Sequence, residues 1–142
     1  MKKCNEVMTP DPKCCVVEDS VVRAAQLMKE ENVGSIPVVE DPRSKKLIGI
    51  ITDRDIAINV VASNNRKPDE VRVGDAMSRN LIVCKQTDPV SQAVQGMASH
   101  QVRRIPVVDQ DNCIVGIISQ GDVALRLKDP ETTGEVVAEI SE

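Results

Sequence analysis

The sequence predicts an α+β protein, α/β in some classification schemes, built from two tandem copies of one β-α-β-β-α unit. Three observations predict it: an internal repeat, apolar residues at helical spacing early in each copy, and paired runs of β-branched residues later in each copy. The 142-residue chain fits one ordinary domain, or two small units with a shared core. Since a unit of about 50 residues cannot cover its own sheet, we expect the copies to pack as a pseudo-two-fold pair.

The internal repeat is visible by direct alignment of the chain with itself. A shift of 69 positions aligns residues 8–39 with residues 77–108 at 12 identities in 32 positions, including Ile-Pro-Val-Val in both copies. A shift of 67 then places Gly-Ile-Ile-Thr-Asp-Arg-Asp on Gly-Ile-Ile-Ser-Gln-Gly-Asp. The repeat divides the chain into a first copy over residues 4–61, a linker over 62–70, a second copy over 71–127 and an acidic tail over 128–142.

Each copy is expected to open with a short apolar strand and a helix. The strands are predicted at residues 14–17 and 82–84. In the second copy, Asp88 is expected to cap the helix and Pro89 to occupy its first position, and the first copy has an Asp-Ser pair at the same place. Apolar residues then recur at a spacing of three and four, which buries one face of a helix.

The second half of each copy is expected to hold two strands and a short closing helix. The strands are predicted from β-branched runs that flank loops of turn residues, at residues 36–39, 47–52, 105–108 and 113–119. The closing helices are predicted at residues 53–61 and 120–127.

The composition excludes several classes of function. The chain has no Phe, Tyr or Trp, so it offers neither an aromatic platform for single-stranded nucleic acid nor an aromatic cage. The net charge is −4, whereas binding to nucleic acid or an anionic membrane needs a basic surface. No apolar run reaches the roughly 20 residues of a membrane span, and no signal peptide is evident. We therefore expect a cytoplasmic protein with no nucleic-acid or membrane partner.

The chain contains five cysteines, an odd number that does not fit a framework of paired disulfides. In a reducing compartment they are expected to be free thiols that pack as small apolar residues. An alternative is a thiol or metal sensor that involves Cys4, Cys14 and Cys15, although the spacings of known zinc sites are absent.

The end of the last strand in each copy carries the most informative pattern. Thr52 and Asp55 in the first copy, and Ser119 and Asp122 in the second, stand three positions apart directly after Gly-Ile-Ile. This is the spacing of a capping box, which satisfies free backbone N–H groups at a helix start. The same geometry suits a ligand, since a helix N-terminus favours a phosphate and a nearby carboxylate can accept hydrogen bonds from a ribose diol. The residues alone leave both interpretations open.

These paired motifs resemble those of a CBS-domain pair, also called a Bateman module. The resemblance rests on Met-(Thr/Ser), Ile-Pro-Val-Val and Gly-Ile-Ile-(Thr/Ser)-x-x-Asp, each present twice, and it covers about residues 4–127. The chain also resembles small stand-alone bacterial proteins of this type. The resemblance implies a regulatory module that binds AMP, ADP, ATP or S-adenosylmethionine in clefts between the copies, with no separate cofactor. It also implies a homodimer that signals through its own geometry or through an effector protein.

The resemblance implies roles for individual residues as well. Asp55 and Asp122 would hold the ribose hydroxyls, while Thr52 and Ser119 would contact ribose or phosphate. Since no aromatic ring is available to stack on adenine, the base must lie between aliphatic faces. The leading candidates for these faces are Ile36, Pro37, Ile105 and Pro106.

The two copies differ where the family often contacts phosphate, just before Ile-Pro-Val-Val. The second copy has Arg103 and Arg104 there, and guanidinium groups suit phosphate. The first copy has Gly34 and Ser35, and offers only Arg54 near its Thr-x-x-Asp motif. We therefore expect the site of the second copy to bind nucleotide phosphate better.

An enzyme is the least favoured class of function. His100 is the only histidine, so no Ser or Cys can be paired with a convincing base. No Gly-rich phosphate loop of the P-loop or dinucleotide-binding type is present. Besides a nucleotide-binding module, a ligand-free dimerisation scaffold and a stress sensor based on thiols or a metal remain as alternatives.

Overall fold

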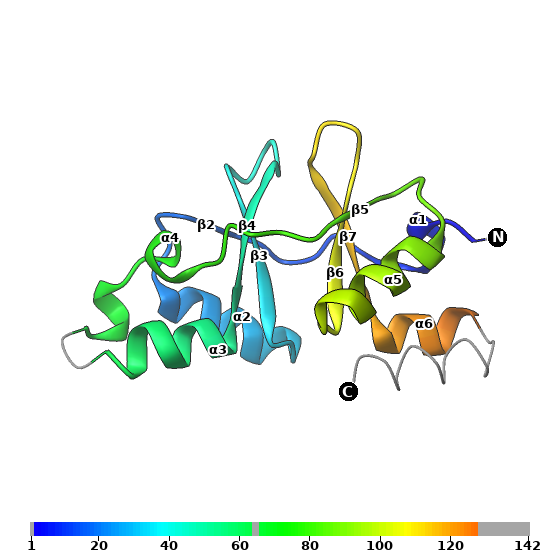
Figure 1. Ribbon diagram of the computed structural model, residues 1–142. Helices are drawn as coiled ribbons and strands as arrows, with labels where there is room; N and C mark the ends of the chain where they lie inside the picture. The colour runs from blue at the N-terminus through cyan, green and yellow to red at the C-terminus, as the bar shows by residue number, and fades with distance from the viewer. Residues whose placement is uncertain (1, 64–65, 128–142) are drawn as a thin grey trace. The chain divides into compact units, whose positions relative to one another are not determined.

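The computed structural model describes residues 2–63 and 66–127, which form two compact units (Figure 1). We name them after the acidic residue of their motif. The Asp55 unit contains residues 13–63 and 66–81, and the Asp122 unit contains residues 2–12 and 82–127. Each unit thus combines one β-α-β-β-α copy with the segment that precedes the other copy. We call these two segments, residues 2–12 and 66–81, the leading segments. The predicted acidic tail lies outside the described residues.

The Asp55 unit is built on a three-stranded sheet in the order β2-β3-β4. Strand β2 runs parallel to β3, and β3 pairs antiparallel with β4. Its elements are β2 (Cys15–Val16), α2 (Val21–Glu31), β3 (Ser35–Val39), β4 (Leu47–Thr52), α3 (Asp53–Ile56), the π-helix η1 (Ala57–Val61), the 3₁₀ turn η2 (Pro68–Glu70) and α4 (Val73–Ala76). Helix α2 contacts β3, and α3 contacts β4.

The Asp122 unit has a four-stranded sheet in the order β1-β7-β6-β5. Its elements are α1 (Cys4–Val7), β1 (Thr9–Pro10), β5 (Cys84–Lys85), α5 (Val90–His100), β6 (Arg104–Val108), β7 (Ile114–Ser119) and α6 (Gln120–Leu127). Strand β1 comes from the N-terminal segment and pairs antiparallel with β7. Helix α1 contacts α5 and α6 in the same unit. The N-terminal segment is therefore an integral part of the unit formed by the second copy.

The predicted β-α-β-β-α order is confirmed in both copies, with corrections at the helix starts. Asp88 does not cap α5, because the N-cap position is Pro89, which has no side-chain acceptor. The Asp88 carboxylate instead accepts a hydrogen bond from the backbone N–H of Lys85 at 2.8 Å. In the first copy Ser20 is the N-cap residue, and its hydroxyl accepts from the N–H of Val22 at 3.1 Å. The turns before α2 and α5 have free backbone N–H groups of their own. Asp19 accepts from the N–H of Val16 in one turn, as Asp88 does from that of Lys85 in the other.

The first strand of each copy is also shorter than predicted, at two residues each. The predictions were residues 14–17 and 82–84, whereas strand pairing covers Cys15–Val16 and Cys84–Lys85. Each of these strands has its parallel partner only at the far end of the following hairpin, at Val38–Val39 or Val107–Val108. Apolar character alone therefore overestimated the length of the paired segment.

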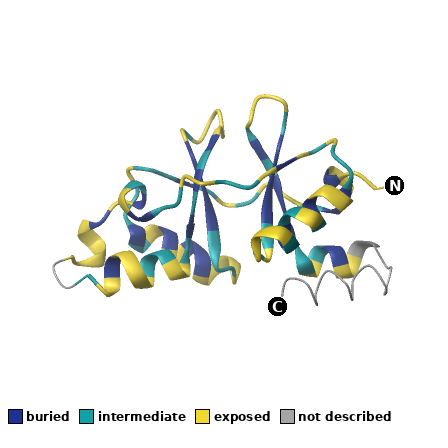
Figure 2. Ribbon diagram, viewed as in Figure 1, coloured by how far each residue is buried: buried dark blue, intermediate teal, exposed yellow. Residues whose placement is uncertain are grey.

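Each unit has its own hydrophobic core, made of aliphatic and sulfur-containing side chains. Figure 2 shows that the buried residues lie mainly along the strands and on one side of each helix. Among the described residues, no polar or charged residue is fully buried. Also within them, no helix combines the length and the apolar character needed to cross a bilayer.

A methionine in each leading segment packs directly onto a glycine of the other copy. Met8 lies against Gly116 in β7, where an added Cβ would stand 2.7 Å from Met8 Cγ and 2.9 Å from the Thr9 carbonyl oxygen. Met77 lies against Gly49 in β4, where an added Cβ would stand 2.9 Å from Met77 Sδ. The repeated Met and Gly therefore form one packing unit, which is why both recur in the sequence.

Candidate functional site

The strand-to-helix junction has the same capping geometry in both units. The Thr52 hydroxyl accepts from the N–H of Asp55 at 3.0 Å, and the Asp55 carboxylate accepts from the N–H of Thr52 at 2.9 Å. Ser119 and Asp122 repeat both hydrogen bonds at 3.0 Å. The capping-box interpretation is therefore correct. Since each cap uses only Oδ2 of the carboxylate, Oδ1 is left for other contacts.

The sheet brings the two predicted arginines of the second copy to this junction. Arg104 is the residue opposite Ser119 in the β6–β7 pair. The carbonyl oxygen of Arg103 accepts from the N–H of Gln120, the first residue of α6, at 3.0 Å. Within the described part of the chain, neither guanidinium forms an ion pair. Two cationic side chains therefore start from the same edge as the hydroxyl and carboxylate of the motif.

The N-terminal segment adds a residue that the sequence analysis missed. The Thr9 hydroxyl donates to Asp122 Oδ1 at 3.0 Å, so both oxygens of this carboxylate are engaged. The indication in the sequence was the repeated Met-(Thr/Ser), in which Ser78 corresponds to Thr9. In the Asp55 unit, however, the Ser78 hydroxyl accepts from the N–H of Asn80 at 3.3 Å. The third polar group at the junction is therefore specific to the Asp122 unit.

The charges around the two junctions have opposite sign. The Asp55 unit places Asp53 and Asp55 beside Arg54, which leaves one net negative charge. Arg54 is exposed, and Asp53 approaches Gly34, where an added Cβ would stand 3.1 Å from Asp53 Oδ2. The Asp122 unit places its two arginines beside a single carboxylate, which leaves one net positive charge. An anionic ligand is therefore favoured at the second junction.

Each junction also contains one buried side-chain oxygen for which the described residues provide no hydrogen-bond partner. These atoms are Oγ of Ser35, at the start of β3, and Oε1 of Gln120, at the start of α6. A buried oxygen that lacks a donor costs free energy, commonly about 1–3 kcal/mol. A ligand or an ordered water that donates to it would recover that free energy.

The predicted adenine contacts lie mostly inside the cores. Ile36 is 2% exposed and Ile105 is 1% exposed, and each belongs to the hydrophobic cluster of its unit. Pro37 and Pro106 are buried beside them in β3 and β6. Their side chains support the strands that lead to the junctions, and a direct contact with a base stays a prediction.

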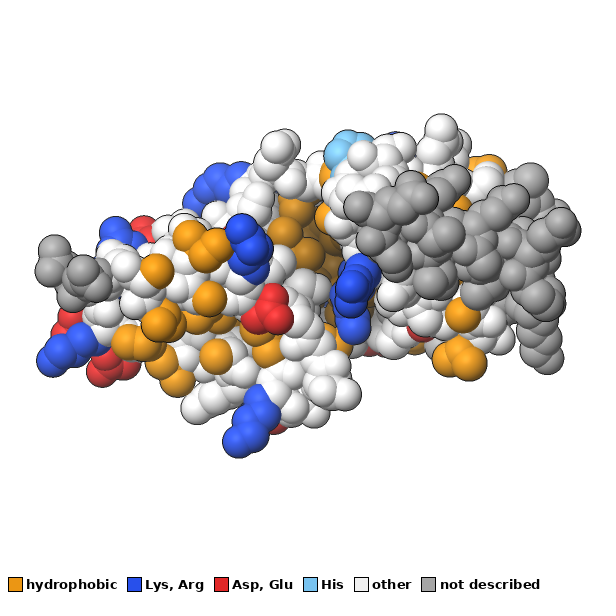
Figure 3. Space-filling model, turned by 60° about the horizontal axis from the view of Figure 1, so that its bottom comes forward, with side chains coloured by type: hydrophobic (Ala, Val, Ile, Leu, Met, Phe, Trp, Pro, Cys, Tyr) orange, Lys and Arg blue, Asp and Glu red, His pale blue; other side chains and the backbone are white. Residues whose placement is uncertain are grey.

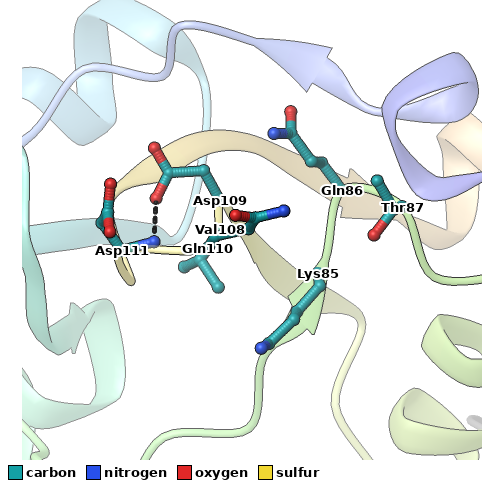
Figure 4. Close-up of a pocket in the computed structure, with 7 residues that line it drawn as sticks. All are labelled: Lys85, Gln86, Thr87, Val108, Asp109, Gln110 and Asp111. Atoms are coloured by element: carbon teal, nitrogen blue, oxygen red, sulfur yellow. Dashed lines mark hydrogen bonds between the residues drawn. The ribbon is translucent and has the colours of Figure 1, made fainter.

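An open pocket of about 230 Å³ lies elsewhere in the Asp122 unit, between β5 with the residues after it and the β6–β7 turn (Figure 4). Lys85 lines one side of it, and Asp109 and Asp111 line the other. The Asp109 carboxylate accepts from the N–H of Asp111 at 2.9 Å, which shapes the turn. None of the predicted site residues lines this pocket, which lies at the opposite end of the β6–β7 hairpin from the junction.

The vicinal cysteines of the first copy both have a raised pKa. Burial raises the pKa of Cys14 to about 11, against an ordinary value of 9.0. Burial also raises the pKa of Cys15 to about 11, with the Asp19 carboxylate acting in the same direction. Cys4 belongs to the other unit. Within residues 2–63 and 66–127, no three His, Cys, Asp or Glu side chains converge in a way that would hold a metal ion.

Comparison with known protein families identifies the fold. The model of the CBS domain family matches residues 4–62 and again residues 73–129. The chain belongs to the CBS domain family. A Bacillus subtilis relative, the uncharacterized protein YlbB, is 38% identical over the whole of this chain and 93% of its own length. The two copies are thus a tandem CBS pair, in which helices and strands recur in the same order.

Solved CBS structures share the fold and include complexes with adenosine compounds. The CBS domain pair crystallised with 5′-methylthioadenosine and S-adenosyl-L-methionine is 26% identical, with a TM-score of 0.76 over 90% of this chain and 97% of that one. CBSX2 in complex with AMP is 28% identical, with a TM-score of 0.76 over 91% and 100%. Hypoxic Response Protein I, with two coordinated zinc ions, is 27% identical, with a TM-score of 0.78 over 87% and 98%.

Proposed function

We propose that this CBS pair is a cytoplasmic regulatory module that binds an adenine nucleotide, AMP, ADP or ATP, at the junction of the Asp122 unit. The observation that carries the proposal is the set of groups at that junction: two guanidinium side chains that form no ion pair with any described residue, a hydroxyl, and a carboxylate that is already oriented. The comparison proteins that hold AMP or S-adenosyl-L-methionine support the same class of ligand.

In this proposal each residue contributes a separate interaction. Asp122 accepts hydrogen bonds from the ribose hydroxyls, since each carboxylate oxygen has two acceptor positions and only one is used by the protein. Arg103 and Arg104 pair with the phosphates, for which the planar guanidinium is well suited. The Ser119 hydroxyl accepts from the N–H of Asp122 and can still donate its own proton to a phosphate, at the positive end of the eight-residue helix α6. At the junction of the Asp55 unit, a corresponding site with lower affinity for the nucleotide would consist of Thr52, Arg54 and Asp55.

The test is titration calorimetry with AMP, ATP and adenosine on the wild type and two matched variants. Asp122→Asn keeps one oxygen for the helix cap but loses a charge and an acceptor, so we expect the Kd for AMP to rise about tenfold to a hundredfold. Asp55→Asn makes the same change at the other junction and should alter the Kd by less than about threefold. Unfolding midpoints of both variants control for damage to the fold.

Each other result has a definite meaning. A larger loss with Asp55→Asn would reverse the ranking of the two junctions, and no loss with either variant would refute the ribose assignment. Arg103→Ala and Arg104→Ala should weaken ATP more than adenosine, because adenosine lacks phosphate. A wild type that binds none of the three compounds would favour the ligand-free scaffold.

A homodimer is the second part of the proposal. Ile58 is 50% exposed and Leu125 is 76% exposed, and the two occupy corresponding positions in the two copies. Figure 3 shows further apolar side chains exposed on the face it presents. Repeated exposed apolar residues are typical of an association surface. Sedimentation equilibrium tests this, and a chain that stays monomeric at micromolar concentration would refute it. An effector protein would then read the geometry of the dimer.

A further inference from the structure

Two cysteines that are 80 positions apart in the chain meet in the core of the Asp122 unit. Cys4 is the first residue of α1 and is 0% exposed, while Cys84 lies in β5 and is 4% exposed. Both belong to one hydrophobic cluster, and their thiols lie close enough to influence each other. Cys4 Sγ also donates to the carbonyl oxygen of Pro89 at 3.8 Å, and Cys84 Sγ donates to that of Pro106 at 3.9 Å. The described structure leaves both as free thiols.

The backbone around this pair holds the N-terminal segment against the start of the second copy. The N–H of Cys4 donates to the carbonyl oxygen of Asp88 at 2.9 Å, and the N–H of Asn5 donates to that of Gln86 at 3.0 Å. An isolated antiparallel β-bridge also pairs the backbone of Lys3 with that of Pro89. The two sulfur atoms thus sit at the contact between α1 and the segment that joins β5 to α5.

The Asp55 unit contains the same contact without the thiol pair. Val73 corresponds to Cys4, and its N–H donates to the carbonyl oxygen of Asp19 at 2.7 Å. Cys15 corresponds to Cys84, and both Val73 and Cys15 lie in the core of that unit. Packing at this position therefore accepts valine, so the fold by itself does not require a thiol at position 4.

We propose that Cys4 and Cys84 form a reversible disulfide that fastens the N-terminal segment, residues 2–12, to the second CBS copy. A disulfide needs its sulfurs at about 2.05 Å, and the two thiols already lie together in one buried cluster of the same unit. The cross-link is specific to the Asp122 unit because the Asp55 unit has valine at the corresponding place.

The oxidant is a peroxide, which takes two electrons from the thiol pair. The Cys4 thiol loses its proton, its thiolate attacks one peroxide oxygen, and the O–O bond breaks. The sulfenic acid forms, and the departing hydroxide takes up the proton that Cys4 released and becomes water. The Cys84 sulfur then attacks the Cys4 sulfur, the S–O bond breaks, and the departing hydroxide takes the thiol proton to form water. Two thiols are oxidised by two electrons in total, and the peroxide is reduced to two molecules of water.

The two thiols lie on different elements. The neighbouring Cys84 thiol lowers the pKa of Cys4, although burial and the Asp88 carboxylate act in the opposite direction. The Cys4 thiol, together with burial, raises the pKa of Cys84. Because Cys4 lies on the four-residue helix α1, an opening of this short helix exposes Cys4 to the oxidant, and Cys84 then resolves the product. Because both are buried, the reaction proceeds through openings of α1.

The consequence for the site follows from Thr9, which lies in the segment that the disulfide would fasten. Thr9 donates to Asp122 at 3.0 Å, and the neighbouring N–H of Asp11 donates to the carbonyl oxygen of Val115 at 3.2 Å. Oxidation would therefore hold Thr9 on the Asp122 carboxylate. This coupling to ligand binding rests on the proposed function, whereas the disulfide itself does not.

The first experiment is peptide mapping of the full chain after treatment with hydrogen peroxide and blocking of free thiols with N-ethylmaleimide. We expect a Cys4–Cys84 linked peptide that dithiothreitol separates. The control is Cys4→Val, which copies Val73 and should keep the unfolding midpoint of the reduced wild type while giving no linked peptide with Cys84. The proposal is refuted if the wild type forms no Cys4–Cys84 link, or if Cys84 links equally to another cysteine.

The second experiment tests whether the disulfide fastens the segment. Hydrogen exchange at the amides of Met8 and Asp11 should slow at least about tenfold on oxidation of the wild type, because openings of the segment become rarer. The same treatment should leave these amides unchanged in Cys4→Val. Equal exchange rates of these amides in the oxidised and the reduced wild type would refute the inference that the disulfide holds the segment in place.

A third measurement separates this proposal from the proposed function. The Kd for AMP should fall about threefold on oxidation, because Thr9 then keeps the Asp122 carboxylate in the orientation that binds the ribose. An unchanged Kd would refute the coupling. If AMP and ATP bind in neither redox state, the proposed function fails, while the peptide map and the exchange rates still decide the disulfide.

Discussion

The Asp55 and Asp122 units have the same order of β-α-β-β-α elements and differ in the side chains at their junctions. Both capping boxes match within 0.1 Å, and each leading segment docks on the opposite copy through a Met–Gly contact. Yet Gly34 and Ser35 in one unit stand where the other has Arg103 and Arg104. The repeated residues therefore maintain the fold, whereas the residues that differ give the two junctions opposite net charge.

The largest expected effect tests the Met–Gly contact. Gly116→Ala should lower the free energy of unfolding by about 3 kcal/mol, since the new Cβ overlaps Met8 and the carbonyl oxygen of Thr9. Gly49→Ala should cost about 1–2 kcal/mol, because its contacts with Met77 and Ser78 are 2.9 Å or longer. Urea unfolding followed by circular dichroism measures both.

The control for this pair is Gly121→Ala in helix α6. The nearest atom to its new Cβ is Ser119 Oγ at 3.6 Å, an ordinary contact, and alanine is the better helix former. It should therefore stabilise the protein by up to about 1 kcal/mol. Equal losses at Gly116 and Gly49 would show that the two leading segments dock equally tightly.

An intermediate effect is expected from pH and concerns Cys15 of the Asp55 unit. Its pKa is raised from 9.0 to about 11, so its contribution to stability is fully present below pH 9 and is lost as the pH rises towards 11. Between pH 8.5 and 11 the wild type should lose about 2 kcal/mol more than Cys15→Val, which keeps an apolar side chain but cannot ionise. Urea unfolding at several pH values measures this, and an equal loss of unfolding free energy in the two proteins over this range would contradict the prediction.

The smallest expected effect concerns the first turns of α2 and α5. Ser20→Ala removes the acceptor for the N–H of Val22 and should cost about 1 kcal/mol, while Ser20→Asn keeps an acceptor and should cost only a few tenths. Hydrogen exchange at Val22 should accelerate in the alanine variant and approach that of the first turn of α5, whose N-cap Pro89 has no side-chain acceptor. No acceleration would mean that packing, rather than the cap, holds this turn.

The sequence was informative wherever a feature depends on residues close together in the chain. The order of elements and the Ser119–Asp122 cap follow from spacings of two to four residues. Thr9 and Asp122 are 113 positions apart, and nothing in the repeat says which copy a leading segment will join. The Asp88 cap was mistaken for a related reason: the helix start and the turn before it both need an acceptor, and spacing alone does not decide between them.

The exchange of leading segments also sets an order in which the chain can fold during synthesis. All described residues of the Asp55 unit lie between positions 13 and 81, so this unit is complete as soon as that stretch has left the ribosome. The Asp122 unit joins residues 2–12 to residues 82–127, so residues 2–12 must wait until that later stretch has been made. Non-local pairing of this kind slows folding. We therefore expect β1 to be the last strand to join its sheet, and a nascent chain to carry residues 2–12 undocked until β7 has emerged.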